Sequence, residues 1–426
     1  MRQMVKKLRV FLLLLSILIV IGGCKKKDKN PDEVINPVED NKQDTGNEDS
    51  EPTPGEDDTN NNDQEDNTED EKPKDDYNPS ELPLVEGGIK GVYAKHNLQA
   101  GTCINGFVIN NYSDHIIENY NSVTLENDMK PEAILNHDKS IKSGDIVVEY
   151  PERTIEQLEW AKKNNMKVRG HVLVWYSQTP QWIFHEKFDT SKKMVDKDTM
   201  LSRMESYLKQ NFKILDELGY SDIFYAYDIV NEAIMDDGSL RDCPWKQIIG
   251  DDYIWHAFNY AKKYAPKHIK LYYNDYNEQF KTDAVVKLAK SLVDDKGNSL
   301  IDGIGCQAHL YTEDSIDKYM KTLEAFSATG LDVQITEIDV SLGTWQNILQ
   351  PTEENLKKQG QYYYKLVSSI IEANKAGTTN VSGITFWGIS DGASWRRDRS
   401  PLLFDEDLKP KYAYFGAVLD YDHSGH

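Results

Sequence analysis

Two glutamates close apolar runs that predict β-strands. Glu232 follows residues 228–231 and Glu337 follows residues 334–336, so the two carboxylates belong to different strands. Hydrolysis of a glycosidic bond requires a pair of carboxyl groups that face each other across a cleft, one protonated and one ionised. Either glutamate alone could equally be an ion-pair partner or a helix cap. The two together, each at the end of a strand, favour a catalytic pair.

Polar and aromatic residues also follow the other predicted strands. Because the carboxyl ends of parallel strands meet at one face of a barrel, these side chains would gather around a single cleft. Tryptophan is most often a core residue, but the tryptophans here have polar neighbours, and the apolar face of a sugar ring stacks on an indole. The candidates beside the two glutamates are Glu126, Asn127, Lys130, His171, Trp175, Gln178, Asn231, Tyr276, Gln307, His309, Asp339, Trp387 and Trp395.

The elements that must position these residues alternate along the chain, which predicts the α/β class. Eight strand-like runs separated by amphipathic stretches favour a (β/α)8 TIM barrel. An open doubly wound sheet is the alternative, but no Gly-rich phosphate loop follows any strand. The predicted strands are 103–109, 122–125, 168–174, 223–230, 269–273, 303–308, 333–338 and 383–387. The predicted helices are 154–165, 200–218, 253–264, 284–294, 316–328 and 354–376.

The N-terminus, residues 1–24, predicts an export signal. Basic residues at positions 6, 7 and 9 precede an apolar run over 10–21. That run is shorter than the about 20 residues of a membrane-spanning helix and fits a secretory signal. It ends in two glycines and Cys24, which resembles a bacterial lipoprotein signal, whose cysteine is acylated. An ordinary signal peptide with a chance cysteine is the alternative.

Residues 25–81 carry 21 acidic residues and 7 lysines, with few apolar residues. Such a segment cannot bury enough apolar surface to fold, and its like charges extend it. We therefore expect a disordered acidic linker over 25–81, followed by one catalytic (β/α)8 domain over 82–426. The formal net charge of −22 argues against a nucleic-acid partner. The sequence has no CxxC pair, and we expect no metal and no cofactor.

Several motifs, in order along residues 82–426, resemble those of glycoside hydrolase family 10 endo-β-1,4-xylanases. The motifs that carry the resemblance are NSVTLENDMK at 121–130, RGHVLVW at 169–175, DIVNE at 228–232, YNDYN at 273–277, GIGCQAH at 303–309, ITEID at 335–339, FWG at 386–388 with SW at 394–395, and PLLFD at 401–405.

This resemblance implies a role for each candidate residue. Glu232 would be the general acid/base and Glu337 the nucleophile of a retaining mechanism. His309 would hydrogen-bond Glu337, with Asp339 behind the imidazole. Asn231 would bind the sugar 2-hydroxyl, and Gln307 would lie near the acid/base. The residues that would bind xylose are Glu126, Asn127 and Lys130 on the non-reducing side, His171, Trp175, Gln178, Trp387 and Trp395 next to the bond that is cut, and Tyr276 on the reducing side.

The sequence departs from the common family pattern at two positions. Pro131 stands where Trp is frequent and Tyr176 where His is frequent, which leaves fine subsite preferences open. The basic run Arg396–Arg399 could receive acidic branches of a substrate, but a surface ion-pair cluster is the favoured interpretation.

The resemblance implies xylan and xylo-oligosaccharides as partners of a monomer. With Cys24, it predicts an exported protein, lipid-anchored at the bacterial cell surface or the periplasmic face of a membrane. Two alternatives stay open: a β-1,4-glucanase with the same barrel, and a surface glycan-binding lipoprotein that has lost catalysis. The second would be expected to lack a carboxylate or its supporting histidine, whereas Glu232, Glu337 and His309 are all present.

Overall fold

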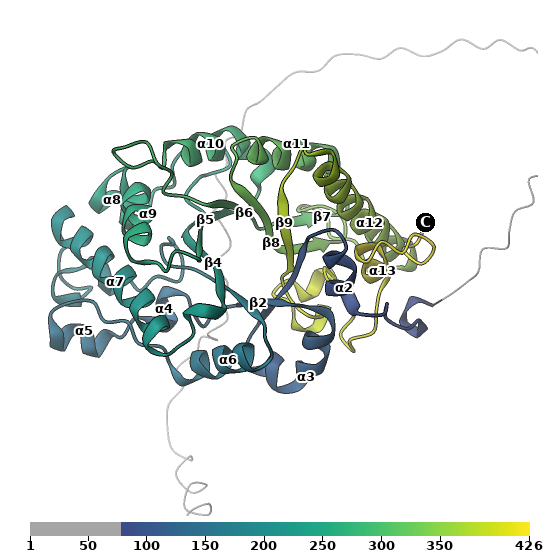
Figure 1. Ribbon diagram of the computed structural model, residues 1–426, viewed down its shortest axis with the longest axis horizontal. Helices are drawn as coiled ribbons and strands as arrows, with labels where there is room; N and C mark the ends of the chain where they lie inside the picture. Colours follow the sequence, from purple (N-terminus) through teal and green to yellow (C-terminus); the bar gives the residue numbers. More distant parts are fainter. Residues whose placement is uncertain (1–77) are drawn as a thin grey trace, which may run out of the picture. The chain divides into compact units, whose positions relative to one another are not determined.

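The computed structural model describes residues 78–426, and Figure 1 shows their helices arranged around the strands. The predicted signal at 1–24 with Cys24, and the linker as far as residue 77, lie outside the described residues. Eight parallel strands close into a ring because β1 pairs with β9 and β6 pairs with β8, which confirms the predicted (β/α)8 barrel. The strands of the ring are β1 Gln99–Ile104, β2 Ser122–Leu125, β3 Lys167–Gly170, β4 Phe224–Asn231, β5 Lys270–Asp275, β6 Gly303–Cys306, β8 Asp332–Ser341 and β9 Val381–Phe386. The short strand β7 His309–Tyr311 lies outside the ring and pairs with β8.

Several helices begin at a polar residue whose side chain accepts a hydrogen bond from a free backbone N–H group. Asp196 caps the long helix α7, and Ser315 and Thr352 cap α11 and α12 in the same way. The long helices bury apolar residues along one side, as α7 does with Met200, Met204, Leu208 and Leu215. The main helices are α2 Gly88–Ala94, α3 Gly106–Asn119, α6 Glu152–Lys163, α7 Lys197–Glu217, α8 Pro244–Ile249, α9 Tyr253–Tyr264, α10 Glu278–Ser291, α11 Ile316–Ser327, α12 Glu353–Ala376 and α13 Tyr412–Ala417.

The predicted strand over 103–109 is wrong in its second half. The strand ends at Ile104, and the side chain of Asn105 accepts a hydrogen bond from the N–H of Val108. That cap starts helix α3 at Gly106, so the apolar residues 107–109 belong to a helix. The strand predicted over 303–308 ends at Cys306, and the short strand β7 that follows it pairs with residues 339–341 of β8.

Polar side chains occupy the barrel interior close to the strand ends. The buried guanidinium of Arg169 in β3 forms an ion pair with Asp228 in β4 and donates to Gln334 Oε1 in β8 at 2.8 Å. Gly305 in β6 leaves the room for this group, since a Cβ there would come within 2.9 Å of Arg169 Nη2. The glycine therefore allows a charged layer to form beneath the mouth of the barrel.

Among the described residues, none of the helices combines the length and the apolar character that crossing a membrane requires.

Candidate active site

Glu232 and Glu337 both lie buried at the mouth of the barrel. Glu232 directly follows β4, and Glu337 lies within β8; their exposed fractions are 7% and 5%. Glu232 has φ of +56°, a left-handed conformation that costs a non-glycine residue roughly 1–2 kcal/mol. Its carboxylate Oε1 accepts hydrogen bonds from Asn231 Nδ2 at 2.8 Å and from Gln307 Nε2 at 3.0 Å.

Two amides connect the two carboxylates. Asn274 Nδ2 donates to Glu337 Oε1 at 2.8 Å and to Asn231 Oδ1 at 2.9 Å, and Asn231 in turn holds Glu232. The hydroxyl of Thr336 donates to Asn274 Oδ1 at 2.7 Å, which orients the amide with its nitrogen toward Glu337. The structure thus brings the predicted pair into one hydrogen-bonded chain. Asn274 lies in the YNDYN motif, but the sequence assigned it no role.

His309 lies between two carboxylates. Its Nε2 is 3.4 Å from Glu337 Oε2, and its Nδ1 is 3.0 Å from Asp339 Oδ2. Burial lowers the pKa of His309, but Asp339 and Glu337 outweigh it and raise the pKa to about 9, so the imidazole is a cation that donates to both. Burial raises the pKa of Glu337, yet the His309 hydrogen bond and the nearby His171 leave that pKa below its ordinary value. Glu337 is therefore ionised at neutral pH.

Asp339 is held by more partners than the sequence indicated. Besides His309, it accepts from Trp395 Nε1 at 3.0 Å and forms an ion pair with Arg396 Nη1 at 3.0 Å. Arg396 is buried, so the interpretation of 396–399 as a surface cluster is wrong for this residue. The physical reason is that the buried Asp339 needs a second cation beside His309.

We expect Arg396→Met to destabilise the fold by about 3–5 kcal/mol at neutral pH, because it leaves a buried carboxylate short of a partner. Burial raises the pKa of Asp339, but Arg396 and His309 bring it below its ordinary value. That pair therefore contributes stability above the unfolded pKa of Asp, and the contribution disappears as pH falls. The difference in the free energy of unfolding between the wild type and Arg396→Met should become smaller toward acidic pH. Urea unfolding at several pH values measures this free energy, and Arg397→Met, which changes an exposed arginine, is the control. A loss of stability in Arg396→Met that is the same at every pH would contradict the ion pair with Asp339.

His171 approaches the proposed nucleophile from the β3 side. Its Nδ1 lies 3.0 Å from Asp228 Oδ2 and 4.0 Å from Glu337 Oε1. Asp228 also forms an ion pair with the buried Arg169, so the carboxylate that holds the His171 imidazole is itself held in place. Sequence reasoning named His171 but missed Arg169 and Asp228. Their signal was available, because Arg169 and Asp228 are charged residues that lie between mainly apolar neighbours in predicted strands.

A second polar cluster lies at the ends of β2 and β3. Lys130 Nζ donates to Asn127 Oδ1 and to Gln178 Oε1, each at 2.8 Å, and lies 5.1 Å from the centre of the Trp175 ring. The predicted binding residues of this side thus contact one another. Glu126 lies next to them and accepts from Asn105 Nδ2 at 3.0 Å.

The aromatic candidates lie on different sides of the carboxylates. Trp387 is buried with its ring edge-on to His171, and Trp395, 49% exposed, packs against His309. Tyr276 lies on the β5 side, where its hydroxyl accepts from Arg241 Nη2 at 3.0 Å.

Arg241 was not identified from the sequence. Its guanidinium also lies 4.2 Å from the centre of the Tyr176 ring, and its Nε donates to the carbonyl of Glu232 at 2.8 Å. The residue lies in a loop without a pattern, so only the folded chain brings it to the site.

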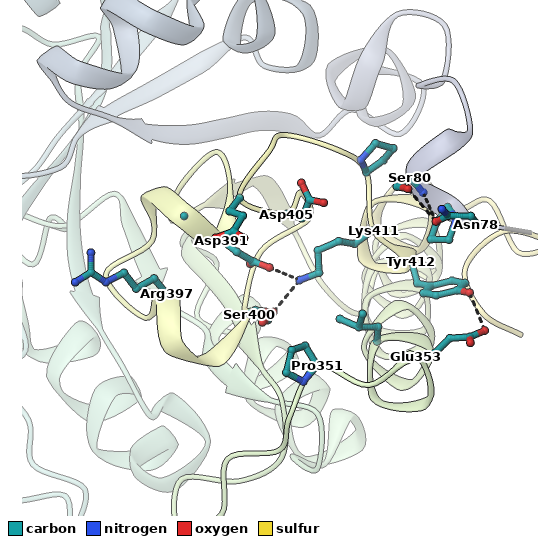
Figure 2. A pocket seen from close by; sticks show the side chains of 15 residues that line it. Asn78, Ser80, Pro351, Glu353, Asp391, Arg397, Ser400, Asp405, Lys411 and Tyr412 are labelled. Carbon is teal, nitrogen blue, oxygen red and sulfur yellow. Dashed lines mark hydrogen bonds and ion pairs between the residues drawn. The ribbon is translucent and has the colours of Figure 1, made fainter.

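A cavity of about 1000 Å³ lies elsewhere, beside the first described residues and the loop after β9. Figure 2 shows Lys411 in its wall, with dashed lines to Asp391 and Ser400. None of the predicted site residues lines this cavity, and it takes no part in the site at the barrel mouth. Within residues 78–426, no group of three or more His, Cys, Asp or Glu side chains could hold a metal ion.

Comparisons with known proteins point to a single family. Residues 88–420 match the family model described as Glycosyl hydrolase family 10. Endo-1,4-beta-xylanase B of Butyrivibrio fibrisolvens is 37% identical over 317 residues, which are 71% of this chain and 48% of that protein. A putative endo-1,4-beta-xylanase of Caldicellulosiruptor saccharolyticus is 38% identical over 69% of this chain and 98% of its own length. Several relatives are much longer than the matched region, which covers 33% of a bifunctional xylanase of Ruminococcus flavefaciens.

A solved structure agrees with these matches. The Clostridium thermocellum endo-1,4-beta-D-xylanase modules complexed with xylohexaose superpose with a TM-score of 0.71 at 33% identity. The superposition covers 81% of this chain and 70% of that one.

Proposed function

Because the chain belongs to glycosyl hydrolase family 10, we propose that it is a retaining endo-1,4-β-xylanase that hydrolyses internal β-1,4-xylosidic bonds of xylan. The observation that carries this proposal is the pair of differently held glutamates. Glu337 is bound by the cationic His309 and by Asn274, whereas Glu232 is bound by two neutral amides. Glu337 is thereby kept ionised, whereas Glu232 has no cation within hydrogen-bonding distance among residues 78–426.

In the proposed reaction, Glu337 attacks the anomeric carbon as Glu232 gives its proton to the departing glycosidic oxygen. The first bond forms between a carboxylate oxygen and the sugar, and the C–O bond to the leaving sugar breaks. Glu232, now a carboxylate, then takes a proton from water, which attacks the same carbon and releases Glu337. Two inversions restore the β-configuration. No metal or redox partner enters this balance.

The surrounding residues support substrate binding in this proposal. Lys130, Asn127 and Gln178 offer donors and acceptors to hydroxyls on the non-reducing side. The buried indole N–H of Trp175 has no partner among the described residues and could serve a sugar hydroxyl. Trp387 and Trp395 would cover the sugar next to the bond that is cut and leave little room for the C6 hydroxymethyl group of glucose. Tyr276 would support the sugar on the reducing side.

Reducing-sugar release from xylan and from carboxymethylcellulose, with binding to both polymers, tests the proposed activity. We expect release from xylan and little from carboxymethylcellulose. Preferential release from carboxymethylcellulose would make the chain a glucanase. Binding without release from either polymer would favour a glycan-binding protein.

We further propose that Cys24 is acylated and tethers the protein to a bacterial membrane surface. The support is the apolar run at 10–21 that ends in Gly22, Gly23 and Cys24. The wild type, expressed in a bacterial host, should incorporate labelled fatty acid and partition into detergent, and Cys24→Ala should do neither. Cys103→Ala, which changes a cysteine of the barrel, is the control that should keep the label. Equal labelling of wild type and Cys24→Ala would contradict the proposal.

A further inference from the structure

The backbone that follows Glu232 is held by a buried cluster on β5 and α10. The hydroxyl of Tyr273 accepts from the N–H groups of Ala233 and Ile234, each at 3.1 Å. Lys281 Nζ donates to the carbonyl of Ile234 at 2.6 Å. The two residues after Glu232 therefore have both N–H groups and one carbonyl bound by side chains from elsewhere in the chain.

The cluster is bound together internally. Asp275 accepts from the hydroxyl of Tyr273 and from Lys281 Nζ, the latter at 2.9 Å. Asp236, in the loop after β4, lies 3.4 Å from the same ammonium, and the ring centre of Tyr276 lies 4.4 Å from it. Lys281 is only 2% exposed, and a buried ammonium is costly unless it is paired and hydrogen-bonded. None of the steps of the proposed reaction uses this ammonium.

The unusual backbone conformation of Glu232 indicates what this cluster stabilises. A glutamate with φ of +56° persists only when its surroundings determine the backbone on both sides. On the N-terminal side, Glu232 N–H donates to the carbonyl of Asn274 at 2.9 Å. On the C-terminal side, Arg241 binds the carbonyl of Glu232, and Tyr273 and Lys281 bind the peptide groups of residues 233 and 234. If this side loosened, the carboxyl group of Glu232 would lose its direction toward the cleft.

We infer that Lys281 is a positioning residue for Glu232, acting with Tyr273 and Asp275 on the peptide groups of residues 233 and 234. The inference rests on the proposed function, because it assigns Glu232 the role of acid/base. Burial raises the pKa of Asp275 to about 6, and the Lys281 ammonium opposes this rise. Without Lys281 the pKa of Asp275 would rise further, and the cluster would lose its ion pair. The other carboxyls near Asp275 are Glu232, Asp236 and Glu278.

The test is the leaving-group dependence of kcat/KM on aryl β-xylobiosides. This parameter reports the first, glycosylating step, and dinitrophenol departs without a proton from Glu232 whereas phenol needs one. Lys281→Met should lower kcat/KM on the phenyl substrate on the order of 10²-fold, but on the dinitrophenyl substrate less than about threefold. Lys290→Met, an exposed lysine on the same helix, removes the same charge and should leave both values unchanged.

Tyr273→Phe is the second variant, because it keeps the ring and removes only the hydroxyl that Ala233 and Ile234 bind. Tyr273→Phe should also lower kcat/KM on the phenyl substrate much more than on the dinitrophenyl substrate. If Lys281→Met does not fold, this variant alone tests whether the cluster positions Glu232. Equal losses on both substrates, or no loss in a folded variant, would overturn the inference. Failure of the proposed function would look different, because the wild type itself would then cleave neither xylobioside.

Discussion

Replacing Glu337 by alanine should lower kcat/KM on xylan and on every aryl xyloside by on the order of 10⁴-fold or more. The reason is that no glycosyl–enzyme bond can form without this carboxylate, whatever the leaving group. In the structure, His309 and Asn274 bind the Glu337 carboxylate and keep it oriented and ionised, and Asp339 holds His309 in place. None of these three residues can act as the nucleophile in its place. Steady-state kinetics on a series of leaving groups measures the effect.

Glu324→Ala, an exposed glutamate on α11, is the matched control and should keep wild-type rates. Added azide should leave Glu337→Ala without a β-glycosyl azide product, because there is no intermediate for azide to attack on that face. If azide instead gave the β-glycosyl azide with Glu337→Ala, and the α-azide by a single displacement with Glu232→Ala, the roles of the two glutamates would be reversed.

Replacing Glu232 by alanine should have an effect that depends on the substrate. The kcat/KM of Glu232→Ala on xylan and on phenyl xylobioside should fall on the order of 10³-fold, since the leaving groups of these substrates need a proton. Dinitrophenyl xylobioside should still glycosylate Glu337, and the intermediate should accumulate because no base activates water. Azide, which needs no base, should then release a β-glycosyl azide.

Mass spectrometry of the stalled Glu232→Ala protein provides the measurement. A xylobiosyl adduct on the peptide that contains Glu337 is the expected result. An unmodified protein, or equal losses on dinitrophenyl and phenyl substrates, would contradict the assignment of Glu232 as the acid/base.

The fold could be predicted from the sequence because apolar residues recur with different spacings in the strands and in the helices of this barrel. Helix α9 runs over Tyr253–Tyr264, the range that the amphipathic pattern predicts. The error at 103–109 arose where an apolar run crosses an element boundary. Only the side chain of Asn105, which caps α3, separates the strand from the helix there.

The site could be predicted less completely than the fold. The residues near the carboxylates stand at strand ends, where polar groups after apolar runs are visible in the sequence. Arg241, Arg396 and Lys281 could not be placed, because each lies in a loop or on a helix and gains its partner only through tertiary packing. Whether an arginine is buried depends on a carboxylate far away in the chain, such as Asp339 for Arg396.

The left-handed conformation of Glu232 also has no local signal, because glycine or asparagine would be the usual residue at such a position. The strain is imposed by neighbours on β5 and α10. Local sequence preference and tertiary structure disagree at this residue, as is common at functional sites.

The anomeric configuration of the first product tests the central proposal most directly. Proton NMR during hydrolysis of a xylo-oligosaccharide by the wild type distinguishes the two anomers before mutarotation mixes them. A retaining reaction through Glu337 predicts that the β-anomer appears first and the α-anomer only later. An α-anomer as the first product would mean a single displacement by water, and would remove the covalent intermediate from the mechanism.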